Sequence, residues 1–244
     1  MRNILLKIEY DGTSYSGWQS QKNAKSIQDT IEAALKRITG RKARLISCGR
    51  TDAGVHALDH IANFKTDSKI PPFKLRRALN SVLPKDVVIK DLKEVPLKFH
   101  SRFGARSKRY RYTIINGPSP PAILRNVTAY VPYKLDTTLM KKEAKSLIGK
   151  HDFKSFQAAD KTERSSVRTI KQIQIKKNGE AIIIDVEADG FLYNMARNIA
   201  GTLIDVGRGR IPAGSMKKIL KAKERSAAGQ TAPARGLCLI RVKY

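Results

Sequence analysis

The sequence predicts an α+β protein of two halves, in which mostly antiparallel strands carry helices on one side. The hydrophobic content of 41% is typical of a globular chain and too high for a disordered one. Strand and helix patterns follow a similar order in the two parts of the 244-residue chain. Asn178-Gly179 separates two strand-like segments, which is a strong hairpin signal and favours antiparallel pairing over a doubly wound parallel sheet.

The first half begins with a strand over residues 3–9 and a turn-rich loop over 11–21. Ser26 is expected to cap the next helix, with Asp29 in a capping-box position, and Gly40 to end it. The other elements predicted in this half are strands at 43–48 and 57–66, a helix after Pro71-Pro72 that runs to about Leu83, and a strand at 86–94.

The second half repeats this order loosely. Its predicted elements are a strand at 107–116, a helix at 137–148, strands at 167–177 and 180–189, helices at 191–206 and 213–222, and a strand at 237–243. By composition, Pro118, Pro120 and Pro121 place a linker at 117–122, although a proline-rich loop inside a domain has the same composition.

The charge balance indicates a polyanionic partner. Lys and Arg number 48 against 21 Asp and Glu, a net charge of +27. So large a charge repels itself in a compact body, and nucleic acid would neutralise it, in a complex that weakens steeply with salt. A lysine-rich proteome would also raise the charge, but it would not place aromatic residues among the basic ones.

Other classes are excluded by what the sequence lacks. No apolar run approaches the ~20 residues of a membrane span. The first residues fit a strand, interrupted by Lys7 and Glu9, rather than a secretory signal, so we expect a soluble cytoplasmic protein. The two cysteines, Cys48 and Cys238, form no Cys-x-x-Cys pair, which argues against a disulfide framework and a structural zinc site.

Asp52 lies at the apex of a short polar stretch between two predicted strands. Gly49 and Gly54 flank it and permit a tight backbone and the close approach of a ligand. The alternative is that Thr51 and Asp52 only form a turn.

A metal site is a further alternative for this region. Its ligands would be Asp52, His56, Asp59 and His60. Because Asp59 and His60 are adjacent, they would point to opposite faces of a strand, which disfavours this site.

Arg197 is the one charged residue in the segment 190–204. A helix this neutral is expected to be buried on most sides, and a buried guanidinium needs a carboxylate partner. Asp52 is the best candidate for that partner. The alternatives are a guanidinium that reaches the surface, or a local partner at Asp189 or Asp205.

Basic and aromatic residues alternate in the segment 102–112. On a strand, Tyr110 and Tyr112 share one face, and Arg109 and Arg111 share the other. One face could hold an RNA base against a ring while the other meets phosphate. A sheet with an aromatic core side and a solvated basic side has the same pattern, and both interpretations can hold together.

Six segments resemble, in order, the TruA family of tRNA pseudouridine synthases. Residues 49–57, GRTDAGVHA, resemble its signature. The other matching segments are 10–19 (YDGTSYSGWQ), 99–103 (FHSRF) with 109–112 (RYRY), 151–156 (HDFKSF), 191–199 (FLYNMARNI) and 232–237 (APARGL). The resemblance spans essentially the whole chain.

The resemblance implies two halves, 1–103 and 104–244, each like an RNA-recognition or ferredoxin-like module. They would share a continuous, mostly antiparallel sheet with a basic active-site cleft, which moves the proline-rich loop into the second half. The resemblance also implies a homodimer in which one tRNA touches both subunits through its anticodon arm.

The resemblance implies a role for individual residues as well. Asp52 matches the nucleophile, Arg197 its ion-pair partner, and Tyr110 a tyrosine that lies against the target uracil and assists loss of the C5 proton. Leu237 matches an apolar residue on the other side of the base, and Arg50 an arginine that helps displace the nucleotide. We assign RNA binding to Arg50, Arg102, Arg106, Lys108, Arg109 and Arg111.

The implied activity is isomerisation of uridine to pseudouridine at positions 38, 39 and 40 of the tRNA anticodon stem-loop. Because no redox change occurs and no atom is added, no cofactor or metal is required. Asp52 would either attack C1′ or remove a sugar proton to give a glycal, and both routes need the carboxylate ionised, as its ordinary pKa of ~3.9 allows. A non-catalytic RNA-binding protein and a metal-dependent phosphodiesterase are the competing hypotheses.

Overall fold

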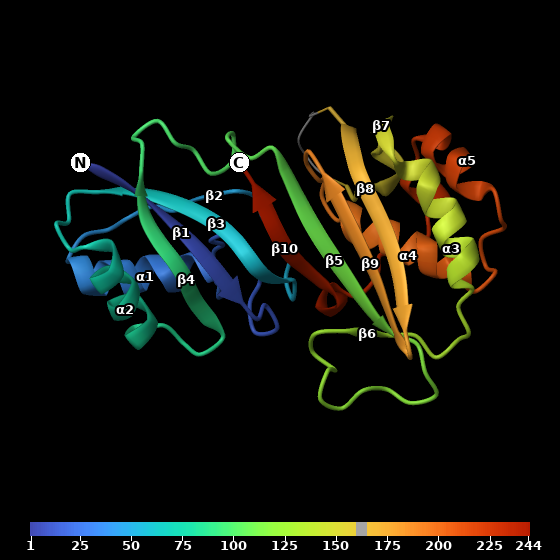
Figure 1. Cartoon of the computed structure of the whole chain (residues 1–244), viewed down its shortest axis with the longest axis horizontal. Coiled ribbons are helices and arrows are strands. Elements are labelled where there is room, and N and C mark those ends of the chain that lie inside the picture. Colours follow the sequence, from blue (N-terminus) through green and yellow to red (C-terminus); the bar gives the residue numbers. More distant parts are fainter. Residues whose placement is uncertain (160–164) are drawn as a thin grey trace. The chain divides into compact units, whose positions relative to one another are not determined.

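The chain folds into two compact units in the computed structural model, which describes residues 1–159 and 165–244 (Figure 1). Unit 1 contains Met1–Arg106 and Leu239–Tyr244, and unit 2 contains Ser107–Cys238. Both units combine helices with mostly antiparallel strands, so the predicted fold class is confirmed. The proline-rich loop at 117–122 lies within unit 2 and is not a linker between the units, which corrects the interpretation based on composition.

Unit 1 contains one group of strands of a ten-stranded, mostly antiparallel sheet. Its strands are β1 (Arg2–Tyr10), β2 (Ile46–Ser47), β3 (His56–Thr66), β4 (Val87–Val95) and most of β10 (Leu237–Lys243). Their order is β4-β1-β3-β10, and β2 pairs with β3. Ile4, Leu6 and Ile8 of the central strand β1 are almost completely buried and form the core beneath the helices.

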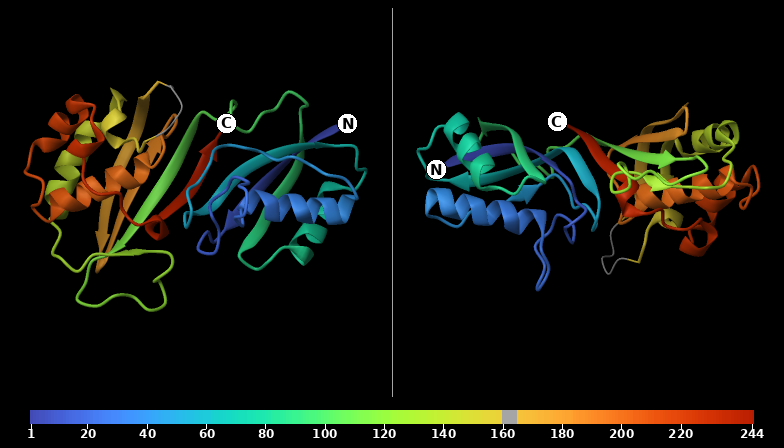
Figure 2. Two further views of the ribbon diagram at one scale, coloured as in Figure 1. Left: turned by 180° about the vertical axis from the view of Figure 1, so that it is seen from behind. Right: turned by 90° about the horizontal axis from the view of Figure 1, so that it is seen from below.

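The helices of unit 1 begin and end for local reasons. In α1 (Ile27–Thr39), the N–H of Asp29 donates to Oγ of Ser26 at 3.0 Å, and Gly40 ends the helix in the left-handed conformation with φ of 71°. The second helix, α2 (Pro72–Val82), contacts both β4 and α1. Figures 1 and 2 show both helices beside the strands of this unit.

Unit 2 contains the other strands of the ten-stranded sheet. Its strands are β5 (Ser107–Ile115), β6 (Ala129–Tyr130), β7 (Gly149–Asp152), β8 (Val167–Asn178) and β9 (Ala181–Ala188). Their order is β5-β9-β8-β7, all antiparallel, and β6 adds a short parallel pairing to β5. The hairpin predicted at Asn178-Gly179 joins β8 to β9, and Gly179 has the left-handed φ of 57° that this turn requires.

Three helices cover the sheet of unit 2. They are α3 (Thr137–Ala144), α4 (Met195–Gly207) and α5 (Ser215–Ala222). As the neutral composition predicts, α4 is buried along most of its length. It begins at Met195 rather than at 191, because Asn194 adopts a left-handed φ of 58° and the residues before it form a turn.

Some short elements differ from the prediction. The strand expected at 43–48 is reduced to Ile46–Ser47, because the carboxylate of Glu32 accepts the N–H of Leu45 at 2.8 Å in place of a strand partner. The helix expected at 137–148 ends at Ala144 and tightens into a 3-10 turn. The strands β6 and β7 were not predicted, since two to four residues become a strand only through the neighbour they pair with.

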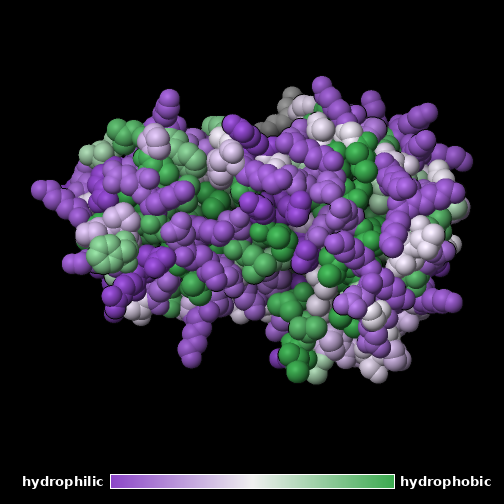
Figure 3. Space-filling view, in the orientation of Figure 1, coloured by the Kyte–Doolittle hydropathy of each residue, from purple (hydrophilic) through white to green (hydrophobic). Residues whose placement is uncertain are grey.

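The surface is mostly hydrophilic on the face shown in Figure 3. A group of hydrophobic side chains stands out on the loop before β6, where Ile123, Leu124 and Val127 are exposed. Among the residues that the structure describes, no helix has the length and apolar character needed to span a bilayer.

Candidate active site

The loop between β2 and β3 carries Asp52 in a tight turn. The N–H of Val55 donates to the carbonyl oxygen of Asp52 at 3.2 Å, and Gly54 has a left-handed φ of 75°. Thr51 is buried, Asp52 is half-buried and Arg50 is exposed. The turn thus fixes the backbone of Asp52 and leaves its carboxylate within reach of a large substrate.

The loop over residues 11–19 packs against this turn, backbone to backbone. A Cβ on Gly17 would lie 2.5 Å from the carbonyl oxygen of Thr51, so only glycine permits the approach. The N–H of Trp18 donates to the same oxygen at 3.1 Å. The first family-like segment of the sequence is therefore the support of the Asp52 turn.

The support continues into the start of α1. The first N–H groups of a helix have no partner within the helix. Here the N–H of Ile27 donates to the carbonyl oxygen of Gly17 at 3.2 Å, and that of Gln28 donates to the carbonyl oxygen of Trp18 at 3.0 Å. A rigid helix therefore holds the loop that holds Asp52.

Buried aromatic side chains form the floor of the turn. The hydroxyl of Tyr10 lies 2.7 Å from Oγ1 of Thr51 and 3.2 Å from Nδ1 of His60. The rings of Trp18 and His60 stack with centroids 3.8 Å apart and planes 16° from parallel. All four side chains are buried, so the turn rests on a packed and hydrogen-bonded base.

The histidines that could have been metal ligands are part of this support. Nδ1 of His56 accepts the N–H of Gly12 at 3.0 Å, and a Cβ on Gly12 would collide with the carbonyl oxygen of Val55. His60 is stacked and hydrogen-bonded as described. Across residues 1–159 and 165–244, no group of three or more His, Cys, Asp or Glu side chains has a metal-binding arrangement.

In unit 2, β5 separates its tyrosines from its arginines, as the alternation predicts. Tyr110 is buried, and its ring packs edge-on against Phe191 with centroids 4.8 Å apart. Tyr112 is also buried, and its hydroxyl donates to the carbonyl oxygen of Pro233 at 2.9 Å. The strand thus holds the segments that contain Phe191 and Pro233.

Tyr112 also determines the path of the chain into Leu237. A Cβ on Gly236 would lie 2.7 Å from the Tyr112 ring, so the backbone lies directly on that ring. Leu237 follows at the start of β10 and is buried. Burial raises the pKa of Tyr112 well above its usual value, and the positive charges of Arg197 and Arg235 partly oppose this shift.

Arg197 is half-buried and held by fixed acceptors. Its Nε donates to the carbonyl oxygen of Ala232 at 2.8 Å, and one terminal nitrogen donates to Oδ1 of Asn194 at 3.0 Å. The alternative local carboxylates have other contacts: Asp205 pairs with Arg208 at 3.1 Å, and Asp189 accepts the N–H of Thr169. The guanidinium therefore has a defined orientation in unit 2.

The next residues of α4 contact two other parts of unit 2, at Phe156 and at residues 230–231. Nδ2 of Asn198 donates to the carbonyl oxygen of Phe156 at 2.8 Å, and its Oδ1 accepts the hydroxyl of Thr231 at 2.6 Å. A Cβ on Gly201 would collide with the carbonyl oxygen of Gln230. The side-chain amide of Asn198 and the close contact at Gly201 therefore hold these distant segments against α4.

The predicted RNA-binding residues have different environments. Arg50, Arg102 and Arg106 are exposed, and Lys108 is half-buried. The other two form ion pairs across the sheet: Arg109 with Glu187 at 3.0 Å, and Arg111 with both oxygens of Asp185 at 2.8 and 2.9 Å. The guanidiniums on β5 thus have acidic partners on β9.

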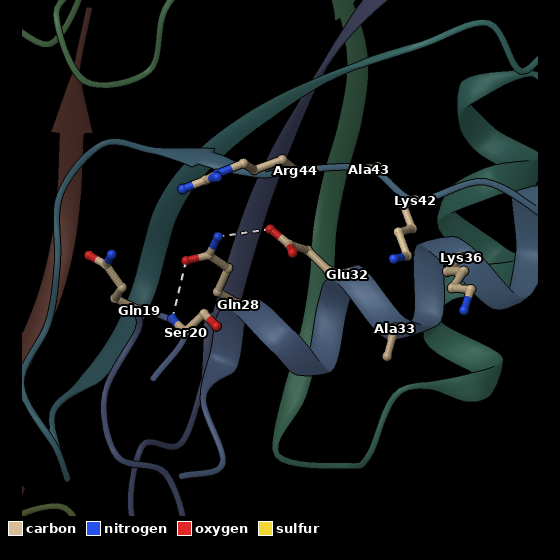
Figure 4. A pocket seen from close by; sticks show the side chains of 9 residues that line it. All are labelled: Gln19, Ser20, Gln28, Glu32, Ala33, Lys36, Lys42, Ala43 and Arg44. Atoms are coloured by element: carbon tan, nitrogen blue, oxygen red, sulfur yellow. Dashed lines mark hydrogen bonds between the residues drawn. The ribbon is translucent and has the colours of Figure 1, made fainter. Parts of the chain in front are cut away.

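A separate pocket of about 560 Å³ lies in unit 1 beside α1 (Figure 4). Lys36, Lys42 and Arg44 contribute cationic side chains to its lining, while Glu32 accepts a hydrogen bond from Gln28. None of the predicted site residues lines this pocket. Its positive charge fits a polyanionic partner rather than a small apolar ligand.

Each unit thus assembles part of the predicted site. Asp52 and Arg50 lie in unit 1, whereas Tyr110, Arg197 and Leu237 lie in unit 2, and the pairing of Asp52 with Arg197 stays a prediction. The supporting residues Trp18 and Asn198 had no assigned role in the sequence, and His60 was considered only as a possible metal ligand. The sequence did show that these residues are polar or large and aromatic and lie inside or beside a family-like segment. Residue type and position do not reveal which residue each of them contacts.

Comparisons with known proteins identify the family of this chain. Residues 7–104 and 144–244 match the family described as tRNA pseudouridine synthase. The chain is 52% identical over 244 residues to tRNA pseudouridine synthase A of Caldicellulosiruptor bescii and 49% identical to that of Acetivibrio thermocellus, with complete coverage of both proteins. A weaker similarity is found to a chain in the crystal structure of a Cbf5-Nop10-Gar1 complex. The TM-score is 0.36 and the identity 12%, over 97% of this chain and 58% of that chain.

The matched ranges include the Asp52 turn in unit 1 and both Arg197 and Leu237 in unit 2, whereas Tyr110 lies between the two ranges. The chain belongs to the tRNA pseudouridine synthases, a family of isomerases that act on uridine in tRNA.

Proposed function

We propose that this protein converts uridine to pseudouridine at positions 38, 39 and 40 of the tRNA anticodon stem-loop, with Asp52 as the nucleophile. The observation that carries the proposal is the support of the Asp52 turn. Gly17 and Trp18 hold its backbone from one side, and Tyr10 bonds the neighbouring Thr51 from below. A turn that only reversed the chain would not need a helix, a stacked ring pair and two close glycine contacts behind it.

The reaction needs one positioned carboxylate. The N1–C1′ bond of uridine breaks, the uracil turns, and a C5–C1′ bond forms. The proton on C5 is lost and N1 gains one, so atoms and electrons balance without a cofactor. Asp52 either attacks C1′ or removes a sugar proton to give a glycal, and both routes use the ionised form.

The other roles follow the resemblance to the family. Arg197 is the proposed ion-pair partner of Asp52, and its fixed hydrogen bonds to Ala232 and Asn194 would limit its motion. Tyr110 would lie against the target uracil, and Leu237 would pack on the other side. Arg50, which is exposed, would help displace the nucleotide, a step that costs a few kcal/mol.

The partners belong to the same proposal. We propose that the protein works in the cytoplasm as a homodimer that binds the anticodon arm of tRNA. The net charge of +27 and the exposed Arg50, Arg102 and Arg106 support binding to phosphate, to which the half-buried Lys108 would add. Arg109 and Arg111 would contribute less to phosphate binding, because Glu187 and Asp185 partly neutralise their charges.

The test uses tRNA that contains 5-tritiated uridine. Asp52→Asn and Asp52→Ala are expected to bind this tRNA with nearly unchanged affinity and to release no tritium above background. Asp67→Asn is the matched control, because Asp67 is an exposed carboxylate of the same unit that pairs with Arg41. Tritium release by the Asp52 variants would refute the nucleophile. Mapping of pseudouridine in tRNA from cells without this protein tests the positions.

A further inference from the structure

Phe103 is the most exposed aromatic side chain among the residues that the structure describes, with 78% of its surface accessible. It lies on the turn between β4 and β5, in the part that belongs to unit 1. Figure 1 shows this segment beside the C-terminus. A ring this exposed can pack against a partner that removes it from water.

The ring is held in a defined place. Nδ1 of His100 accepts the N–H groups of both Arg102 and Phe103, at 3.2 and 3.3 Å, and the N–H of Gly104 donates to the carbonyl oxygen of His100 at 2.9 Å. The His100 ring packs against Phe103 with centroids 4.4 Å apart. A closed turn of this kind restricts the backbone on both sides of the exposed ring.

A buried polar network anchors the turn from below. Oδ1 of Asn63 accepts both the N–H and the hydroxyl of Ser101, at 2.9 and 2.7 Å, and Nδ2 of Asn63 donates to Asn3 at 2.9 Å. The hydroxyl of Tyr244 donates to the carbonyl oxygen of Ser101 at 2.7 Å. Asn3, Asn63 and Ser101 are almost completely buried. Fully satisfied networks of this kind fix one geometry, and here they present Phe103.

The charge around the ring indicates the chemistry of its partner. The guanidinium of Arg102 lies over the Phe103 ring, 5.7 Å from its centroid. Lys98 and Arg106 flank the turn, and residues 95–106 contain no acidic side chain. An unpaired nucleotide supplies a flat base for the ring and a phosphate for the cations. An apolar protein pocket would instead have to desolvate these charges.

We propose that Phe103 is a stacking surface for an unpaired nucleobase of the RNA substrate, separate from the uracil that reacts. Arg102 orients the ring and contacts the adjoining phosphate. The inference rests on the proposed function only in taking RNA as the substrate. It assigns to Phe103 a part of substrate binding and no part of bond breaking.

The first test measures binding and turnover with an unmodified tRNA transcript. Phe103→Ala and Phe103→Leu are expected to raise both Kd and KM about 5- to 150-fold, the range found when a stacked ring is removed, with kcat within about twofold. Phe103→Tyr keeps a ring and should behave like the wild type. Phe73→Ala is the matched control, because Phe73 is an exposed ring of the same unit on α2 and should leave Kd unchanged.

The second test reports on stacking directly. The indole introduced by Phe103→Trp should lose fluorescence on addition of the transcript, with a midpoint at the Kd, and should not respond to inorganic polyphosphate. The wild type is the control, because its single tryptophan, Trp18, is 1% exposed and out of reach of a base. This readout requires no catalysis, so it remains informative if the protein forms no pseudouridine.

Three results would overturn the inference. One is an unchanged Kd for Phe103→Ala. Another is an equal effect of transcript and polyphosphate on the indole, which would show a purely ionic contact. The third is wild-type binding by Phe103→Leu together with a lower sedimentation coefficient for Phe103→Ala, which would show that the ring packs on another protein chain.

Discussion

Gly17 packs so closely against Thr51 that a Cβ on Gly17 would lie 2.5 Å from the Thr51 carbonyl oxygen. The same atom would lie 3.1 Å from the carbonyl carbon of Asp52, and Gly17 has a φ of 91°. Both the contact and the backbone conformation therefore require glycine. The position of Asp52 depends on a residue 35 places earlier that takes no part in the chemistry.

Gly17→Ala should displace the Asp52 turn without unfolding the protein. We expect kcat for tritium release to fall roughly 10- to 100-fold, since small misplacements of a reacting group are costly. The left-handed φ should also lower the free energy of unfolding by about 1–2 kcal/mol. Gly179→Ala separates the two effects, because Gly179 has a φ of 57° with nothing within 4 Å. It should lose only the stability due to the left-handed φ and keep full activity; equal kcat in the two variants would contradict the support role.

Tyr10→Phe should weaken the floor of the turn. The substitution removes a buried hydroxyl 2.7 Å from Thr51 and 3.2 Å from His60. A lost hydrogen bond of this kind costs about 1–2 kcal/mol, measured as a lower urea midpoint. Tyr130→Phe removes a more exposed hydroxyl that bonds Pro118 at 3.1 Å, and it should cost less than about 0.5 kcal/mol. If both substitutions shift the midpoint equally, the Tyr10 contact does not stabilise the turn.

The support of the turn should depend on pH through Asp11. Burial tends to raise the pKa of Asp11, but the hydrogen bonds from Thr13 and the proximity of His56 lower it below its ordinary value of 3.8. Because the pKa is lower in the folded state than in the unfolded state, the ionised carboxylate stabilises the fold at a pH above 3.8. This contribution to the free energy of unfolding is lost as the pH falls through the folded pKa. Asp11→Asn should be less stable than the wild type at pH 7, and the gap in urea midpoint should close below about pH 4. A gap that stays constant down to pH 3 would exclude this contribution.

Binding of tRNA should weaken steeply with salt. With about six phosphates contacted, affinity should fall roughly 10³-fold between 50 and 200 mM salt. Arg50→Gln should reduce the slope of log K against log salt concentration by about one. Arg111→Gln should leave the slope unchanged and lower stability by about 1 kcal/mol, because its guanidinium pairs with Asp185. If Arg111→Gln reduced the salt slope and Arg50→Gln did not, Arg111 would be the phosphate contact.

Gly236→Ala should disturb the approach to Leu237. The added Cβ would lie 2.7 Å from the ring of Tyr112, which is buried and held by its hydrogen bond to Pro233. Overpacking at such a site costs roughly 1–3 kcal/mol, read from thermal or urea unfolding. Gly190→Ala meets only the flexible side chain of Arg168 at 3.3 Å and should have a small effect. Wild-type stability of Gly236→Ala would mean that this segment is free to shift.

Several features could be predicted because their causes are local. The helix from Ser26 to Gly40 has both caps where the residue types place them, since a cap depends on the next few residues. The alternation on β5 separates Tyr112 from Arg111 because side chains on a strand alternate. The glycines beside Asp52 indicated a tight loop for the same local reason.

Other features required the partner to be known. Arg109 and Arg111 on β5, which were assigned to RNA binding, pair with acids on β9 more than 70 residues away, at Glu187 and Asp185. The strands β6 and β7 exist only because β5 and β8 lie beside them. Residue spacing does not predict these ion pairs and strand pairings, since each joins two segments that the fold brings together.

The sequence by itself determined the fold class, the approximate positions of its longer elements and Asp52 as the residue to examine. These follow from periodicity, capping and the conformational range of glycine, which act over a few residues. Only the tertiary structure decided that Gly17, Trp18 and His60 support the Asp52 turn, and that Asn198 joins α4 to its surroundings. The reason is physical. Close backbone contacts and buried hydrogen bonds join atoms that are near in space, and the separation of two residues along the chain does not predict whether they are near in space.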